Sequence, residues 1–120
     1  MPALHFVFVF PVHDVSIEHH DDTVIVLASG ELDAFAAPDL AAALGAVADT
    51  RRVVVDLTRV AFMDSTALGE VVRTARARHG NVLRVLLPVG PARRIFEITG
   101  LDRALPVART RIEAVRELGT

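Results

Sequence analysis

Two hydroxyl side chains and a carboxylate stand together where an apolar run gives way to a helical pattern. Asp64, Ser65 and Thr66 follow the apolar residues 53–55, and apolar residues at helical spacing continue from Leu68. The first four backbone N–H groups of a helix lack partners inside it, and Asp, Ser and Thr are the side chains that bind them. The pattern therefore predicts a strand-to-helix turn in which Asp64 or Ser65 caps the helix.

The same position also suits a regulated hydroxyl group. A phosphate on Ser65 would lie against free N–H groups and the positive end of the helix dipole. It would add about −1.5 to −2 charges to a neutral part of the surface. The pattern alone leaves both interpretations open, a helix cap and a phosphorylation site.

The stretch from Phe62 to Gly69 resembles the phosphorylation-site motif of the STAS family, the bacterial anti-sigma factor antagonists. That motif is an apolar pair followed by Asp, Ser, Ser or Thr, Gly, Leu and Gly. The chain departs from it once, with Ala67 where glycine is usual. By resemblance the phosphate acceptor is Ser65, the hydroxyl directly after the aspartate, and Thr66 is the alternative acceptor.

Two further segments resemble the same family. Gly30-Glu31-Leu32-Asp33 corresponds to its second signature, and residues 91–101 match its Pro-x-x-x-Ile-Phe-x-x-x-Gly-Leu arrangement. The resemblance implies an α/β fold with a single mixed sheet of about 4–6 strands, mostly parallel in its core, packed with about four helices. It divides the chain into an N-terminal apolar extension over residues 1–14 and a STAS domain over residues 15–120.

The resemblance also implies a partner switch. The unphosphorylated protein would bind an anti-sigma factor that is itself a serine kinase, and a sigma factor would be released. The kinase would then phosphorylate Ser65 and a serine phosphatase would reset the protein. A surface built on a small hydroxyl buries a dianion only at high cost, so the phosphate would break the complex. The partner contacts expected from the resemblance are Glu31, Asp33, Asp64, Thr66, Ala67 and Leu68.

Two alternatives accompany this interpretation. The first is that Glu31 and Asp33 only shape the turn after their strand, where Asp33 caps the next segment of the chain. The second is that the chain is a STAS scaffold or ligand-sensing module in a larger regulatory complex. A phosphoserine mimic that changes binding would distinguish the partner switch from the scaffold.

A nucleophilic serine is the remaining chemistry that Ser65 could support, and it needs a general base such as histidine. The five histidines stand at positions 5, 13, 19, 20 and 79. His79 ends the predicted helix about 20 Å from Ser65 at 1.5 Å per residue, and the others belong to N-terminal strands. The Gly-x-Ser-x-Gly elbow is absent, since Met63 and Ala67 flank the serine. We therefore expect no enzyme activity.

Composition removes several other function classes. All 13 basic residues are arginine, so a P-loop, which needs lysine, is excluded. We therefore expect no ATP cofactor in this chain and expect any ATP to be bound by a partner. Residues 1–60 hold nine acidic residues and three arginines, whereas residues 61–120 hold six and ten. The arginines are scattered and the chain has no Tyr or Trp, which argues against nucleic-acid binding. The absence of cysteine fits a cytoplasmic protein without disulfides.

The N-terminal residues 3–10 are apolar and rich in strand-forming residues, with Pro11 directly after them. The run is far shorter than the roughly 20 residues that span a bilayer, and no basic residue precedes it as in a signal peptide. It predicts an extra strand that covers a sheet edge or forms a homodimer contact with a second copy. Residues 20–23 are expected to form a turn. His19, His20, Asp21 and Asp22 are expected to be solvated rather than to bind a metal, because neighbouring strand residues face opposite ways and the two histidines are poorly placed to share one ion.

The remaining helices and strands are predicted from hydrophobic periodicity and from the residues that start or end helices. Alternation predicts a hairpin of strands 15–19 and 24–28, and a helix starts near Pro38 and ends near residues 49–50. A strand over 52–57, a helix ended by Gly80 and a strand over 83–87 form a βαβ unit, which places Ser65 at the carboxyl end of its strand. A helix over 91–100, a strand over 105–108 and a last helix through Leu118, capped by Thr110 and Glu113, complete the chain.

Overall fold

The computed structural model describes residues 13–78, 82–87 and 89–118. The predictions made for residues 3–10, for His79 and for the helix stop at Gly80 lie outside this part of the chain. The strands are β1 (His13–His20), β2 (Thr23–Leu32), β3 (Arg52–Met63), β4 (Val82–Leu86) and β5 (Val107–Ala108). The helices are α1 (Ala37–Ala46), α2 (Ser65–Ala77), α3 (Pro91–Thr99), α4 (Leu101–Ala104) and α5 (Arg111–Leu118).

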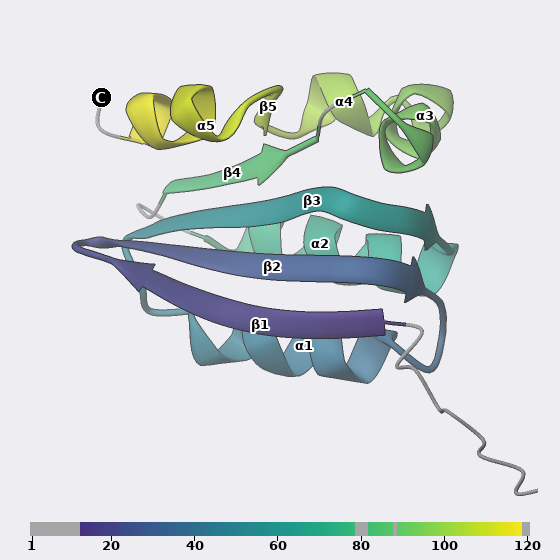
Figure 1. Ribbon diagram of the computed structural model, residues 1–120, viewed down its shortest axis with the longest axis horizontal. Coiled ribbons are helices and arrows are strands. Elements are labelled where there is room, and N and C mark those ends of the chain that lie inside the picture. Colours follow the sequence, from purple (N-terminus) through teal and green to yellow (C-terminus); the bar gives the residue numbers. More distant parts are fainter. Residues whose placement is uncertain (1–12, 79–81, 88, 119–120) are drawn as a thin grey trace, which may run out of the picture.

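The strands form one mixed sheet in the order β1-β2-β3-β4-β5 (Figure 1). β1 pairs antiparallel with β2, and all later neighbours are parallel. The predicted α/β fold with a mostly parallel sheet is therefore confirmed. So is the predicted βαβ unit, because β3 and β4 are parallel and α2 connects them.

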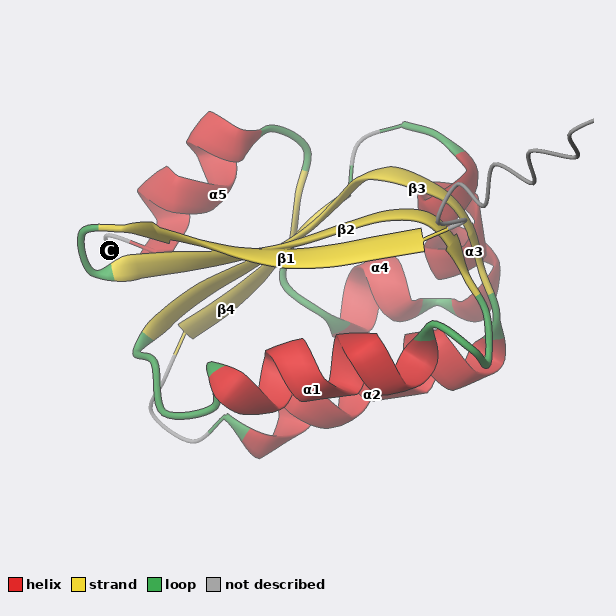
Figure 2. Ribbon diagram, turned by 60° about the horizontal axis from the view of Figure 1, so that its bottom comes forward, coloured by secondary structure: helices red, strands yellow, loops and turns green. Residues whose placement is uncertain are grey.

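Helices cover both faces of the sheet. Figure 2 shows α1 and α2 together beneath it and α5 above it. The alternation of each strand explains this arrangement, since successive side chains point to opposite faces. The core on the α1 and α2 side includes Val24, Val26, Leu40, Leu44, Val53, Val55, Val71 and Phe96. The smaller core on the α5 side consists of Ile25, Val54, Leu86, Ala108 and Ala114.

The C-terminal half of β3 was not predicted, because the strand was expected to end at Leu57. It continues to Met63 by pairing with β2 as far as Leu32↔Met63. Register shifts lie between Leu27 and Ser29 and between Gly30 and Glu31, and Gly30 has a φ of 81°. Gly30 therefore serves an irregularity inside β2 rather than the turn after it. These irregularities break the simple alternation that sequence reasoning depends on.

Two other boundaries also differ from the prediction, since β2 continues past residue 28 to Leu32 and α1 ends at Ala46 rather than near residues 49–50. The boundaries of α3 and the start of α5 agree with local chemistry. α3 begins at Pro91 and ends at Gly100, whose φ of 76° is the left-handed conformation expected of a helix stop. Thr110 Oγ1 accepts a hydrogen bond from the backbone N–H of Glu113 at 3.1 Å, so the predicted cap of α5 is present. α4 was not predicted. It is only four residues long, too short for helical periodicity to be recognised.

Arg78 fastens the end of the fold opposite to the carboxyl ends of the parallel strands. Its guanidinium donates hydrogen bonds to the backbone carbonyls of Val47 and Val82, both at 3.3 Å, and to that of Thr50. Partial burial lowers the pKa of Arg78 below its ordinary value, although the group stays charged. This contact joins the segment after α1 to the start of β4.

Candidate functional site

Asp64 is the residue that turns β3 into α2. Its backbone N–H donates to the carbonyl of Leu32 at 3.0 Å, which holds the turn against the end of β2. Its Oδ1 accepts hydrogen bonds from the N–H groups of Thr66 and Ala67, each at 3.0 Å. The helix cap is therefore Asp64 and not Ser65, whereas the sequence pattern allowed either residue to be the cap.

Ser65 is left with an exposed side chain at the first position of α2. No hydrogen bond links its hydroxyl to another residue in the described ranges. Thr66, the alternative acceptor, is exposed as well. The expectation that free N–H groups await a phosphate is wrong for Thr66 and Ala67, since Asp64 occupies both.

Ala67 and Leu68 point into the protein. Ala67 has no exposed surface and Leu68 has 8%. Both belong to the core cluster on the α1 and α2 side of the sheet. Ala67 therefore accommodates its methyl group, the single departure from the motif, inside the core. As a partner contact Ala67 can act only through the spacing it imposes, whereas Leu68 keeps a small accessible edge.

The loop after β2 lies beside this turn. Asp33 Oδ1 accepts hydrogen bonds from the N–H groups of Phe35 at 3.0 Å and Ala36 at 3.1 Å. Asp33 thus caps the turn that leads into α1, as predicted, although it does not cap the helix itself. Glu31 is exposed and is the register partner of Phe62 in β3. The carboxyl ends of β2 and β3 therefore bring both predicted segments to one edge of the sheet.

Two aromatic residues at this edge were missed by sequence reasoning. Phe35 is 88% exposed and Phe62 is 45% exposed. Exposed phenylalanines beside a polar rim are typical of protein-protein contacts. The available signal was Phe35 itself, an aromatic side chain inside a turn. Phe62 was interpreted only as part of the apolar pair in the motif.

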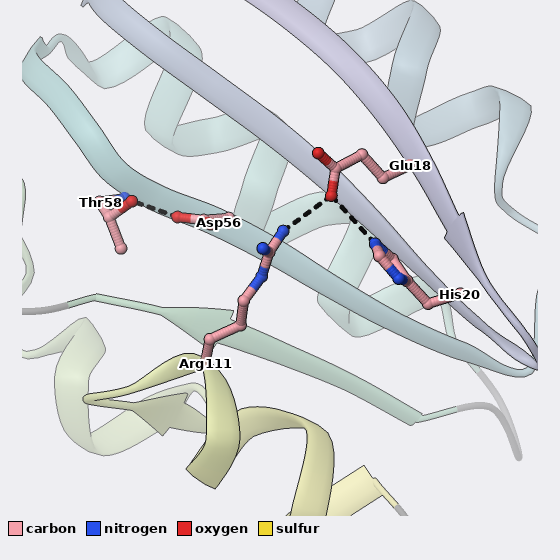
Figure 3. Close-up of polar contacts among 5 residues, drawn as sticks. All are labelled: Glu18, His20, Asp56, Thr58 and Arg111. Atoms are coloured by element: carbon pink, nitrogen blue, oxygen red, sulfur yellow. Dashed lines mark hydrogen bonds and ion pairs between the residues drawn. The ribbon is translucent and has the colours of Figure 1, made fainter.

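The opposite face of the sheet carries a separate polar cluster. Glu18 Oε2 accepts hydrogen bonds from His20 Nε2 at 3.0 Å and from the Arg111 guanidinium at 2.8 Å (Figure 3). Nearby on β3, buried Asp56 accepts a hydrogen bond from the N–H of Thr58 at 2.9 Å. The cluster ties the first hairpin to α5 and lies on the face away from α2.

The histidines show no arrangement for catalysis or metal binding within the described residues. His13 Nε2 lies 2.8 Å from Asp39 Oδ2, and His20 is bonded to Glu18. No described histidine forms a hydrogen bond to Ser65. His19, His20, Asp21 and Asp22 are exposed, but β1 continues through His20 and β2 begins at Thr23, so the turn consists of Asp21 and Asp22 and is shorter than the predicted residues 20–23. No group of three potential metal ligands gathers in the part of the chain that the structure describes. None of the helices there has the length and apolar character needed to cross a bilayer.

Comparison with known proteins finds relatives along most of the chain. Residues 14–114 match the family model described as STAS domain. An anti-sigma-B factor antagonist of Staphylococcus epidermidis is 39% identical over 95 residues, which cover 73% of this chain and 85% of the relative. The crystal structure of an anti-sigma factor antagonist from Mycobacterium paratuberculosis is similar with a TM-score of 0.84 and 30% identity, over 90% of this chain and 95% of that one. The Bacillus cell fate determinant SpoIIAA in its phosphorylated form shares the fold, with a TM-score of 0.66 and 24% identity over 88% of this chain and 99% of that one.

Removing the Asp64 cap should destabilise the protein measurably. We expect Asp64→Ala to lower the free energy of unfolding by about 1 kcal/mol, because two N–H groups lose their acceptor. Asp64→Asn keeps an acceptor oxygen and should lose only a fraction of that. Urea unfolding followed by circular dichroism measures both. Equal stability of Asp64→Ala and the wild type would show that the cap contributes nothing.

The Glu18 cluster should titrate below the usual range. The hydrogen bond from His20 lowers the pKa of Glu18 from its ordinary 4.5, desolvation opposes this, and Arg111 adds to the lowering. Because the folded-state pKa is the lower one, the stabilising contribution is complete above pH 4.5 and is lost as the pH falls through the folded-state pKa.

Carboxyl NMR titration checks this assignment. In His20→Ala the pKa of Glu18 should rise toward its ordinary value. The matched control is His19→Ala, which removes an exposed neighbour that faces the other side of the strand. A Glu18 pKa that is unchanged in His20→Ala would contradict the proposed cause.

Proposed function

The chain belongs to the STAS domain family, and we propose that it is an anti-sigma factor antagonist regulated by phosphorylation of Ser65. In this mechanism the unphosphorylated protein binds an anti-sigma factor that is also a serine kinase, and a sigma factor is released. The kinase then phosphorylates Ser65, the complex separates, and a serine phosphatase restores the binding form. Support for the antagonist role comes from relatives that carry that name over most of this chain.

The observation that carries the proposal is the exposed hydroxyl of Ser65 beside a helix cap supplied by Asp64. A cap serine would lose its structural bond on modification, but Ser65 has no such bond to lose. A phosphate there leaves the cap intact and adds a dianion next to the Asp64 carboxylate. A kinase can therefore modify Ser65 without unfolding the start of α2.

The same geometry explains why a phosphate would separate the partners. The N–H groups of Thr66 and Ala67 are already bound to Asp64, so they are not available to neutralise the new charge. A partner that closes over this edge would have to bury an unpaired dianion, which is costly. We propose Glu31, Asp33, Thr66 and the edge of Leu68 as partner contacts, and we add Phe35 and Phe62 as apolar anchors. Asp64 and Ala67 set the shape of this surface.

The proposal assigns no catalytic role to the chain itself, because ATP and the transferred phosphoryl group belong to the kinase. It places the protein in the cytoplasm, where sigma factors act. The second candidate function is a STAS scaffold or sensor whose binding does not depend on Ser65. The exposed Phe35 and Phe62 would serve a scaffold equally well, so only the response to phosphorylation separates the two functions.

A pull-down from native cell extract tests the switch. The baits are the wild type, Ser65→Ala and Ser65→Asp, with Thr66→Asp as the matched control for added charge at the next position. We expect the wild type and Ser65→Ala to recover an ATP-binding kinase. We expect Ser65→Asp to recover at least about tenfold less of it, because the partner would bury the new carboxylate beside the carboxylate of Asp64. Thr66→Asp should retain more binding than Ser65→Asp.

Equal recovery by all four baits would reject Ser65 as the switch and favour the scaffold. Loss in Thr66→Asp with full binding by Ser65→Asp would transfer the acceptor role to Thr66. Incubation of each bait with the recovered kinase and ATP, followed by mass spectrometry, then identifies the modified hydroxyl directly.

For the N-terminal extension we propose a structural role. β1 is the edge strand of the described sheet, and residues 3–10 are rich in strand formers. They would add a strand to a sheet edge or join two copies in a homodimer. A variant without residues 1–11 should lose stability in the first case and half its mass in solution in the second. A variant that keeps both would rule out both roles.

A further inference from the structure

An open groove of about 600 Å³ runs along α2 on the side that starts at Ser65. Its lining residues are Ser65, Leu68, Gly69, Val72, Arg73, Arg76, Ala77 and Leu101. At 1.5 Å per residue, Ser65 and Arg76 are about 16 Å apart along the helix axis, or three turns. The groove is therefore long and shallow, which suits a segment of another protein better than a compact small molecule.

The middle of the groove is apolar. Leu68 and Val72 come from α2 and Leu101 from the start of α4, so two segments far apart in the sequence build one surface. Gly69 contributes no side chain and leaves the groove open between Ser65 and Arg73. A Cβ placed on Gly69 would meet only Arg73 Nη2, at 3.8 Å, which is an ordinary contact. Glycine is about 1 kcal/mol less favourable than alanine inside a helix, so helix formation does not explain the glycine at position 69.

The end of the groove away from Ser65 is positively charged. The Arg73 side chain is exposed, and its Nη1 lies 3.1 Å from Oε1 of the half-buried Glu70. Arg76 is exposed and forms no ion pair with a residue in the described ranges. The groove thus has an apolar middle, a hydroxyl at one end and two arginines at the other.

We propose that this groove binds an amphipathic, acidic helix of the partner. Its apolar side chains would lie on Leu68, Val72 and Leu101, and its carboxylates would pair with Arg73 and Arg76. Helix-in-groove recognition reads apolar residues at helical spacing, and three turns match the length of the groove. Addition of a strand is not available here, because β3 beneath α2 is paired on both sides.

This inference rests on the proposed function in one respect: the helix belongs to the anti-sigma factor kinase. Ser65 forms one end of the groove, so a phosphate there would narrow that entrance and place a dianion where the end of the bound helix would otherwise lie. The groove is therefore a second partner-binding surface beside Ser65. The Phe35 and Phe62 edge provides apolar anchors, and the groove discriminates by charge.

The test selects helical peptides of about 14 residues, roughly four turns, from a phage-displayed random library on the unphosphorylated wild-type chain. The selected peptides are then titrated as synthetic probes against three variants. Gly69→Trp fills the groove from a helical position that has room for a side chain. Arg73→Glu with Arg76→Glu reverses its charge. Arg109→Glu with Arg116→Glu makes the same charge change at exposed positions near and on α5 and is the matched control.

We expect the selected peptides to carry apolar residues at helical spacing and Asp or Glu near one end. Their affinity should fall at least about tenfold for Gly69→Trp and for the Arg73 and Arg76 double variant, because charges are reversed or the groove is filled. The control should bind as the wild type does. Peptides with Lys in place of their acidic residues should regain binding to the Arg73 and Arg76 double variant.

Several outcomes would overturn the inference. If selection succeeds equally on Gly69→Trp, the groove is not the binding site. If the selected peptides carry no carboxylates, Arg73 and Arg76 do not contribute to binding. Binding of the wild type to phosphatidylcholine vesicles containing phosphatidylserine, lost in Gly69→Trp, would assign the groove to a lipid surface. Self-association lost in Gly69→Trp would assign it to a second copy.

Failure of this inference and failure of the switch can be told apart. Peptide binding uses the unphosphorylated chain alone, so it does not depend on any kinase. If Ser65→Asp still recovers the kinase but the peptides bind as expected, the groove stands and the switch falls. If Ser65→Asp loses the kinase but Gly69→Trp retains it, the switch stands and the groove falls.

Discussion

The structure depends on one aspartate that bonds three ways at the junction of two strands and a helix. The Asp64 N–H reaches the carbonyl of Leu32, its carboxylate binds the N–H groups of Thr66 and Ala67, and its carbonyl accepts from Leu68 at 3.0 Å. These bonds satisfy backbone groups that a helix start would otherwise leave open. They also decide which side chain is structural, because Ser65 is released from capping and faces solvent.

The separation of roles continues along α2. One side of the helix places Ala67 and Val71, both fully buried, in the core. Another side meets Leu101 and forms the open groove, with arginines instead of apolar residues at its far end. The buried side holds α2 in the core, and the groove side is the one on which we propose that a partner binds. The same helix thus contributes both to the core of the domain and to the proposed recognition surface.

Sequence reasoning succeeded where local chemistry decides the structure. Pro91 and Gly100 delimit α3 because one fixes a helical φ and the other adopts a left-handed one. It failed where distant segments decide. The end of β3 depends on pairing with an irregular β2, and the choice of Asp64 over Ser65 as cap depends on the orientation of the turn. The contribution of Leu101 to the groove likewise follows only from the assembled fold.

The hydrogen bonds of Asp64 also determine whether a phosphate on Ser65 would affect the stability of the domain or the binding of a partner. A phosphate that found free N–H groups would stabilise the helix, and part of its effect would remain inside the domain. Here the N–H groups of Thr66 and Ala67 are occupied, so a phosphate on Ser65 would gain no hydrogen bond from them. Its charge would act instead on whatever closes over Ser65, where each 1.4 kcal/mol or so of repulsion weakens binding about tenfold. A domain with a fixed cap can therefore convert one covalent change into a change of partner while keeping its own fold.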